Sequence, residues 1–264
     1  MSDRLPISVC LISGAEVRRI GRTLESLSGW AAEILVVLNA EVNDGTEELC
    51  LQYGARVFRE PWKGHIAQKN SAADKATQPW VLGVDADEVV TAGLRDEIRR
   101  TLADPAMTAR CTAFSMPRCS WYLGRWIRHG DWYPDRKTRL WKRGQGRWVG
   151  EDPHDRLEAS GEVGRLNEDL QHYSYTGIAH HLSKLQIYSD IFVRESLAAG
   201  KRPRPLDAWI RPPWRFLRGY VFRAGFLDGW PGFVIAWMSS VLAFLKYAKL
   251  REAVAAQRAE GHTS

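Results

Sequence analysis

The sequence has few of the features that mark secreted or disulfide-stabilised proteins. Its 264 residues contain four cysteines and no CxxC pair, which argues against a zinc ribbon or a disulfide scaffold and favours reduced, buried thiols. The first residues, MSDRLPISVCLIS, lack a basic region, a long apolar stretch and a cleavage site, so they predict no secretory signal peptide. We therefore expect the body of the protein to lie in the cytoplasm.

Long hydrophobic runs, internal repeats and low-complexity tracts are also missing. Near the C-terminus, the 16 residues 230–245, WPGFVIAWMSSVLAFL, carry no formal charge. As a helix this segment would span about 24 Å. A bilayer core is about 30 Å thick and usually needs about 20 apolar residues. The segment is therefore predicted to lie in or dip into a membrane interface rather than to cross the membrane.

Charge and tryptophan are unevenly distributed. Hydrophobic residues make up 45% of the chain and charged residues 26%, a composition typical of a globular protein with a sizeable core. The net charge is +6, but residues 201–250 hold nine basic and two acidic side chains, so the rest of the chain is close to neutral. This pattern excludes a uniformly basic protein that coats nucleic acid and indicates a near-neutral body with a basic end.

The first hundred residues alternate between strand and helix patterns. Short apolar runs rich in β-branched residues alternate with segments whose apolar residues recur at helical spacing, which predicts an α/β fold with a largely parallel sheet. Ligands of such sheets usually lie beyond the carboxyl ends of the strands. The predicted strands are Ile7–Ile12, Glu33–Leu38, Ala55–Phe58 and Trp80–Val84, with helices around residues 17–27, 44–53, 65–76 and 94–102.

The remaining chain changes in texture. Short β-like pieces at residues 112–116, 138–142 and 164–173 are separated by loops rich in glycine, proline and aromatics, and a helix is predicted over residues 178–199. Gly200 and the basic KRPRP segment then predict a linker. We expect a catalytic domain over residues 1–200 and a basic, aromatic, amphipathic helical tail over residues 201–264.

The segment WVLGVDADEVV places carboxylates where the fourth strand ends. Asp85 and Asp87 flank one residue, so both can approach a common cation, and Glu88 is placed to orient or cap. Oxygen-only donors favour Mg²⁺ or Mn²⁺ over zinc. Acids after a strand also cap the next helix in many proteins. An aspartyl phosphotransferase is a further alternative, although that class usually has Thr or Val where Glu88 stands.

With these residues in view, the sequence resembles the family 2 glycosyltransferases, and among them the enzymes of lipopolysaccharide core biosynthesis. The resemblance covers nearly the whole chain. It implies an A-type glycosyltransferase fold, with a Rossmann-like nucleotide-binding half and a mixed central sheet, a nucleotide-sugar donor, Mg²⁺ or Mn²⁺, and inversion at the anomeric carbon. The ordered segments that carry it are ISVCLISGAE, VVLNAEVNDGTEE, GHIAQKNSAAD, LGVDADE, YLGRWIRHGDWYPDRKTRLWKRGQGRW, PHDRL, HYSY and FLKYAKL.

The resemblance also implies roles for single residues on the donor side. Asn39 stands where many family members have an Asp that binds the base; its amide keeps an acceptor oxygen but adds donors and loses charge, and uridine remains the expected base. Lys69 would offset diphosphate charge, or is simply an exposed helix lysine. The residues expected at the nucleotide sugar are Ser13, Glu16, Asn39, Gln68, Lys69 and Asp85.

The metal and the general base follow from the same resemblance. Asp87 and His172 are expected to hold the cation, although a lone histidine is often a hydrogen-bonded core group. The family's base falls in PHDRL, which makes Asp155 the first choice and Asp152 the second. The alternative for Asp155 is a surface ion pair with Arg156 or a neighbour.

Between Trp121 and Trp148, aromatic residues are interleaved with arginines. Aromatic faces stack on sugar rings and guanidinium groups bind phosphates, as an anionic glycan acceptor would require. The same mixture suits single-stranded nucleic acid, and some of these tryptophans must belong to the core. We expect a glycan rather than nucleic acid. The expected acceptor-binding residues are Trp121, Arg125, Trp126, Arg128 and Trp132.

The tail alternates Trp, Phe and Tyr with Arg, a composition suited to anionic lipid headgroups. The alternative is an apolar helix packed on the catalytic body or on a second subunit. Together these features predict a hexosyltransferase, glucose-like in its donor, that is peripheral or monotopic on the cytoplasmic face of the inner membrane and acts on a lipid-linked oligosaccharide. The rival is a non-catalytic membrane or glycan-binding protein with a degenerate donor site.

Overall fold

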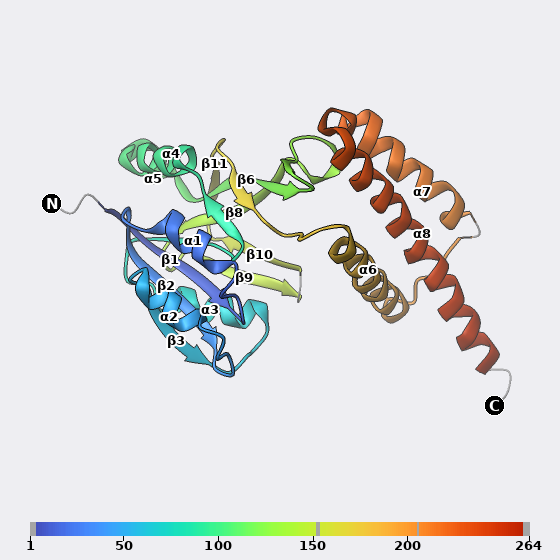
Figure 1. Cartoon of the computed structure of the whole chain (residues 1–264), viewed down its shortest axis with the longest axis horizontal. Coiled ribbons are helices and arrows are strands. Elements are labelled where there is room, and N and C mark those ends of the chain that lie inside the picture. Colours follow the sequence, from blue (N-terminus) through green and yellow to red (C-terminus); the bar gives the residue numbers. More distant parts are fainter. Residues whose placement is uncertain (1–3, 152–153, 205, 261–264) are drawn as a thin grey trace. The chain divides into compact units, whose positions relative to one another are not determined.

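The computed structural model of the chain describes residues 4–151, 154–204 and 206–260 (Figure 1). The described residues form two compact units. The first contains the chain up to Cys119 together with Asp135–His172, and the second contains Ser120–Pro134 and the chain from Tyr173 onward. The predicted boundary after residue 200 falls within the second unit, and the division into a catalytic domain and an attaching tail stays a prediction.

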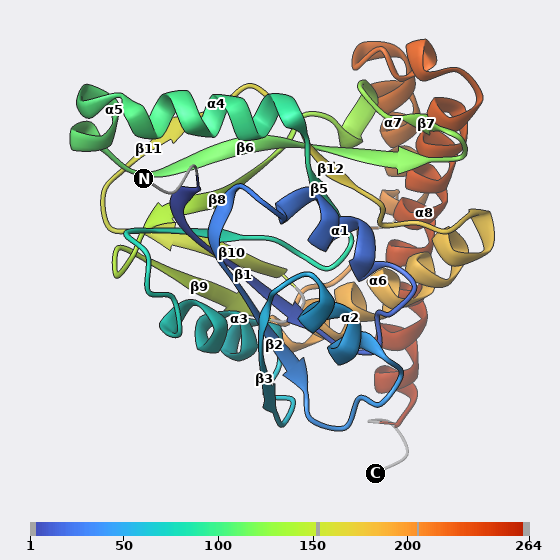
Figure 2. The ribbon, with the colours of Figure 1, turned by 60° about the vertical axis from the view of Figure 1, so that its left-hand side comes forward.

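The first unit is built on a mixed sheet. Four strands run parallel in the order β3-β2-β1-β4; β8 then pairs antiparallel with β4, and β6 pairs antiparallel with β8. The apolar runs of β1, β2 and β4 are buried on both faces, which is the pattern expected of strands covered by helices. Figure 2 shows β1, β2 and β3 side by side. The strands are β1 (Leu5–Ser13), β2 (Ala31–Asn39), β3 (Arg56–Glu60), β4 (Trp80–Gly83), β6 (Cys111–Tyr122) and β8 (Asp135–Lys142).

Helices pack on both faces of this sheet, and each face has its own hydrophobic core. Alternate residues of β1 point to opposite faces, so Val9 and Leu11 join the core under α1, α2 and α4, whereas Cys10 joins the core under α3. Trp141 and Trp148 are buried in the second of these cores. The helices are α1 (Ile20–Leu27), α2 (Thr46–Gln52), α3 (His65–Asp74), α4 (Ala92–Ala103) and α5 (Pro105–Arg110).

Short strands complete the first unit around the end of β4. β5 (Glu88–Val90) pairs antiparallel with β12 (Leu170–His172), and β11 (Glu162–Arg165) runs parallel to β6. β9 (Gly146–Glu151) and β10 (His154–Ala159) form a hairpin. The Asn70 side-chain amide holds this hairpin on α3, because it exchanges two hydrogen bonds of 2.9 Å with the backbone of Trp148.

The second unit is mainly helical. The tail forms a helical pair, α7 packed on α8, and α6 also packs on α8. Gly232 allows one close approach, because a Cβ atom there would lie 1.9 Å from the carbonyl oxygen of Gly225. The elements are β7 (Arg125–Trp126), η1 (Gly130–Trp132), α6 (Ile178–Ala198), α7 (Asp207–Leu217), η2 (Arg218–Phe222), η3 (Gly225–Asp228) and α8 (Gly229–Glu260).

The predicted alternation of strands and helices, the mixed sheet and the helical tail are confirmed. The four cysteines are buried, and none of them forms a disulfide within the described residues. Within the described residues, one helical stretch, Gly225–Arg258, is long and apolar enough to cross a membrane by length and composition alone. It extends well beyond the predicted uncharged segment.

Candidate active site

The loop that follows β4 carries three carboxylates, and Glu88 braces it from within. Glu88 is fully buried; its Oε2 accepts a hydrogen bond of 3.0 Å from the backbone N–H of Asp85. Its Oε1 lies 2.7 Å from Arg139 and 3.3 Å from Arg118. Because protein groups occupy both of its oxygens, Glu88 fixes the shape of the loop that carries Asp85 and Asp87.

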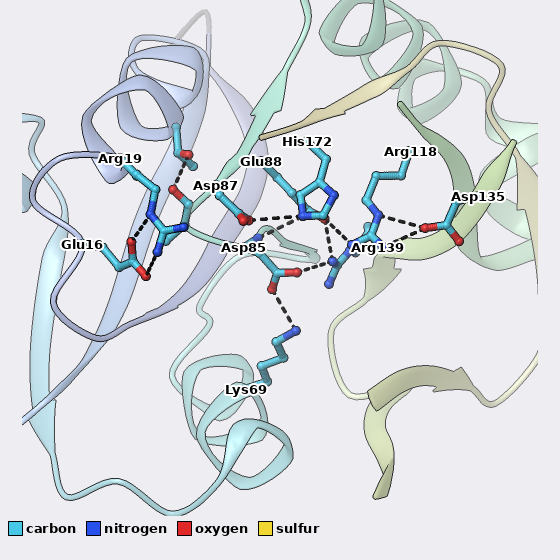
Figure 3. A network of polar contacts seen from close by, with 12 residues as sticks. Glu16, Arg19, Lys69, Asp85, Asp87, Glu88, Arg118, Asp135, Arg139 and His172 are labelled. Carbon is cyan, nitrogen blue, oxygen red and sulfur yellow. Dashed lines mark hydrogen bonds and ion pairs between the residues drawn. The ribbon is translucent and has the colours of Figure 1, made fainter. Parts of the chain in front are cut away.

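Asp85 is held between two cations. Its Oδ2 lies 2.5 Å from Arg139 and its Oδ1 lies 2.8 Å from Nζ of Lys69 (Figure 3). Burial by itself raises the pKa of the Asp85 carboxyl, but Arg139 and Lys69 outweigh it and keep that pKa well below its usual range. Asp85 is therefore a fixed negative charge at the end of the sheet.

Asp87 faces the histidine of the HYSY segment. β5 and β12 pair so that His172 lies opposite Glu88, which brings Nε2 of His172 to 3.5 Å from Oδ1 of Asp87 (Figure 3). Burial raises the pKa of Asp87, and the hydrogen bond and charge of His172 more than compensate, so the pKa is lowered. The two residues expected to share a cation are therefore neighbours, although 85 positions separate them in the sequence.

Lys69 joins the loop to the predicted base. Its Nζ lies 2.8 Å from Oδ2 of Asp155 as well as 2.8 Å from Asp85, and it sits over the ring of Trp148, 4.6 Å from the centroid. Asp155 stands on β10 opposite Gly150. Since Asn70 fixes the same hairpin to α3, neighbouring side chains of one helix place both the hairpin and its carboxylate.

Two other residues expected to contact the nucleotide sugar stand at the carboxyl ends of β1 and β2. Ser13 ends β1 next to Leu38 of β2, and its hydroxyl donates to the carbonyl of Gly14. Asn39 ends β2, where its Oδ1 accepts from the N–H of Glu41 at 3.3 Å. These positions agree with the edge at which ligands of such sheets bind.

Glu16 and Gln68, which are also expected to contact the nucleotide sugar, have distinctive surroundings. Glu16 forms a bidentate pair with Arg19, with both contacts at 2.7 Å (Figure 3). Gln68 is fully buried, and among the described residues its side-chain amide has no hydrogen-bond partner. Contact of Gln68 with a donor stays a prediction. Asp152, the second choice for the base, lies outside the described residues.

The residues expected to bind the acceptor all belong to the second unit. Trp121 and Trp126 pack edge to face at 5.1 Å, and Trp126 also contacts Tyr173 at 5.2 Å. Trp132 stacks on Tyr175 with an interplanar angle of 15°. Arg125 pairs with the buried Asp228, and Arg128 is exposed and gives its backbone N–H to the same carboxylate.

Part of the predicted acceptor segment has a different role. Trp141 and Trp148 are core residues, as expected for some of the tryptophans. Arg139, grouped by sequence with phosphate-binding arginines, is 3% exposed and pairs with Asp85 and Glu88 instead. Sequence reasoning missed Arg139 and Arg118 as parts of the site. No local signal separated Arg139 from the other basic residues of β8, because the strand reads DRKTRLWK and sheet pairing decides which of them meets a buried carboxylate.

The side chains around Asp87 fit a cation that takes some of its ligands from the protein and the others from a bound substrate. Among the described residues, no three His, Cys, Asp or Glu side chains are grouped so as to hold a metal ion. Mg²⁺ is usually bound by one or two carboxylates together with waters and substrate phosphates rather than by an all-protein cage. One carboxylate beside one imidazole meets that requirement only when a diphosphate is also bound.

Comparisons with known proteins identify the family of the chain. Residues 8–157 match the family described as Glycosyl transferase family 2. The lipopolysaccharide core biosynthesis glycosyltransferase LpsC of Rhizobium meliloti is 29% identical over 257 residues, which cover 95% of this chain and 93% of that protein. An uncharacterized glycosyltransferase of Rickettsia felis is 28% identical over 263 residues, covering 94% and 90%.

Solved structures show the same fold. The mannosyltransferase PcManGT of Pyrobaculum calidifontis, solved with GDP-Man and Mn²⁺, has a TM-score of 0.55 at 14% identity and covers 94% of this chain and 87% of its own. TarS of S. aureus, residues 1–349 with UDP-GlcNAc, has a TM-score of 0.50 at 12% identity, with 96% and 92% covered. Together with the mixed sheet, these likenesses confirm the predicted A-type glycosyltransferase fold.

Proposed function

Because this chain belongs to glycosyltransferase family 2, we propose that it moves a hexose from a nucleotide sugar to a lipid-linked glycan with inversion at the anomeric carbon. The observation that carries the proposal is the position of Lys69, which joins the Asp85 loop to Asp155 next to Asp87 and His172. These contacts support a donor site and a general base that lie close together. LpsC, similar over almost its whole length, suggests the lipopolysaccharide core as acceptor.

On the donor side, the edge formed by β1 and β2 receives the nucleoside. Ser13, Glu16 and Asn39 stand at that edge, and the Asn39 amide pairs with the base, which we expect to be uracil. Asp85 is the carboxylate next to the sugar nucleotide. Its ion pairs with Arg139 and Lys69 keep the carboxylate ionised, so it can accept hydrogen bonds from the ribose hydroxyls.

Asp87 and His172 would hold Mg²⁺ or Mn²⁺, which supplies positive charge that stabilises the departing diphosphate. His172 is oriented by the pairing of β12 with β5 and so faces Asp87 without rearrangement. Lys69 adds a second positive charge on the side of α3. The protein thereby places cationic character where negative charge grows as the glycosidic bond breaks.

Asp155 acts as the general base. The acceptor hydroxyl attacks the anomeric carbon opposite the diphosphate; its oxygen forms the new glycosidic bond, its proton passes to a carboxylate oxygen of Asp155, and the old bond leaves its electrons on the diphosphate. In the structure Oδ2 of Asp155 accepts a hydrogen bond from Lys69. The diphosphate competes for the same ammonium group, so donor arrival frees this oxygen for the proton.

We place the enzyme on the cytoplasmic face of the inner membrane as a peripheral or monotopic protein. The tail forms α7 and α8, and many of its aromatic side chains are exposed: Trp209 is 74% exposed, Trp230 64% and Trp237 55%. Aromatic rings interspersed with arginines are typical of segments that lie in the membrane interface. This attachment would bring the catalytic unit to a lipid-linked acceptor.

A panel of UDP- and GDP-sugars tests the reaction class. We expect slow release of nucleoside diphosphate from at least one donor with Mn²⁺ or Mg²⁺, and loss of that release when a chelator is added. No cation-dependent turnover with any donor would favour a glycan-binding protein instead. The aspartyl phosphotransferase alternative predicts a phosphoenzyme that Asp85→Asn abolishes, whereas a glycosyltransferase forms none.

A further inference from the structure

Asp131 of the second unit gathers three arginines around one nearly buried carboxylate. Its side chain is 10% exposed, and the guanidinium groups of Arg218 and Arg223 lie 3.6 and 3.5 Å from Oδ1. Arg215 lies 3.6 Å from Oδ2. The arginines come from α7, η2 and the residue after η2, whereas Asp131 lies in η1, so the cluster is assembled from separate segments.

The cluster carries more positive charge than its carboxylate neutralises. One negative charge faces three positive ones, at distances longer than the 2.7–2.9 Å typical of charge-assisted hydrogen bonds. The arginine side chains remain 42%, 37% and 47% exposed, in the order Arg215, Arg218 and Arg223. Each guanidinium has five N–H donors, more than its contact with Asp131 uses. The carboxylate of Asp131 thus holds three guanidinium groups close together and leaves them able to bind a further anion.

Apolar side chains of the same segments are exposed beside these arginines in the sequence. Trp214 and Phe222 pack at 5.7 Å and are 53% and 69% exposed. On α8, Phe233 stacks on both Trp230 and Trp237, which forms an aromatic stripe at helical spacing. Other exposed apolar side chains of the same helical segments include Trp209, Leu217, Val221 and Phe226.

We propose that Arg215, Arg218 and Arg223 form a phosphate-binding site for anionic phospholipid headgroups, held in place by Asp131. A soluble phosphate ligand would not account for the exposed aromatic and aliphatic side chains, whereas a bilayer surface offers phosphates and acyl chains together. The site rests on the proposed membrane attachment and adds to it a specific headgroup contact. Guanidinium forks match phosphate oxygens in two-point geometry, which distinguishes such a site from diffuse attraction.

Vesicle flotation with matched charge variants tests the site. In the full chain, Arg215, Arg218 and Arg223 are replaced by Gln; the control replaces the exposed Arg202, Arg204 and Arg251 of the same tail. Both triple variants lose the same charge. With phosphatidylglycerol vesicles we expect the site variant to bind about tenfold more weakly than the control variant. Equal loss in the two variants would overturn the site and leave attachment by general charge.

Two further arms keep the outcomes separate. Phosphatidylcholine vesicles should bind the wild type weakly, and a wild type that floats with neither lipid would overturn the attachment itself. If the Gln variant fails to fold by circular dichroism, a triple Arg→Lys variant keeps the charge opposite Asp131 but removes the forks. That variant should bind phosphatidylglycerol vesicles more weakly than the wild type, and unchanged binding would overturn the site. Donor hydrolysis should stay unchanged in all folded variants.

Discussion

Nζ of Lys69 lies 2.8 Å from Oδ2 of Asp155, and the same ammonium group lies 2.8 Å from Oδ1 of Asp85. The lysine therefore links the predicted base on the β9–β10 hairpin to the acidic loop after β4. A single ammonium cannot bind two carboxylates and a diphosphate equally well. Donor binding is thereby expected to change the surroundings of the base before the acceptor reacts.

Lys69→Met should weaken binding of the donor's nucleoside diphosphate. Loss of one charge-assisted hydrogen bond is worth about 1.5–3 kcal/mol, which corresponds to an affinity about 10- to 100-fold lower. Isothermal titration calorimetry in the presence of Mn²⁺ measures this change. Lys75→Met is the matched control, because Lys75 lies on the same part of the chain but pairs with Glu60. Equal affinities of wild type and Lys69→Met would contradict the role of Lys69.

Asp87→Asn should raise the Mn²⁺ concentration needed for diphosphate binding. The amide keeps the size of the side chain but loses the negative charge opposite the cation, and we expect a shift of about tenfold or more. Titration of Mn²⁺ at a fixed concentration of nucleoside diphosphate gives the midpoint. Asp96→Asn, an exposed change on α4, serves as the control. If Asp87→Asn and the control share the wild-type midpoint, the cation site lies elsewhere.

His181 should make the second unit less stable in mild acid. Burial, aided by Lys184 and His180, lowers the pKa of His181 from 6.5 to about 4, and Tyr122 Oη lies 2.8 Å from its Nδ1. Between these pH values the unfolded chain binds a proton that the folded chain does not. The free energy of unfolding therefore falls as the pH is lowered from 6.5 to about 4, by about 3 kcal/mol in all.

Denaturant unfolding of the wild type and of His181→Gln at several pH values measures this effect. The difference between the two proteins should shrink as the pH is lowered through that window, because the variant lacks the titrating group. At pH 8 the variant should be the less stable protein, since its buried amide replaces a matched ring. A difference that stays constant from pH 7 to pH 4 would show that His181 does not titrate as described.

Much of the fold was predictable from local pattern. The apolar runs around Ile7, Glu33, Ala55 and Trp80 predicted β1 to β4 to within a few residues, because strands buried on both faces leave a continuous signal. The end of α8 was not predictable from hydrophobicity. Beyond Leu245 the helix continues through charged residues and alanines, which are good helix formers but give no apolar run.

The sequence allowed us to predict several residues of the candidate site, but not the contacts that these residues make with one another. Motif order assigned roles to Asp85, Asp87, Asp155 and His172, but Lys69 and Asp155 are 86 positions apart, and nothing local in the sequence brings them together. Arg139 was missed because its partners, Asp85 and Glu88, come from another strand end. Whether a strand arginine faces solvent or a buried carboxylate depends on sheet pairing, which local composition does not encode.

The central claim is that Asp155 is the general base. The most direct test measures both sugar transfer and donor binding by the Asp155→Asn variant. We predict that nucleoside diphosphate binds with near wild-type affinity while cation-dependent transfer falls by about 10²- to 10⁴-fold, as expected for loss of a general base. Asp74→Asn, on α3, should leave both quantities unchanged. Substantial residual transfer by Asp155→Asn would contradict the assignment of the base and move it to Asp152.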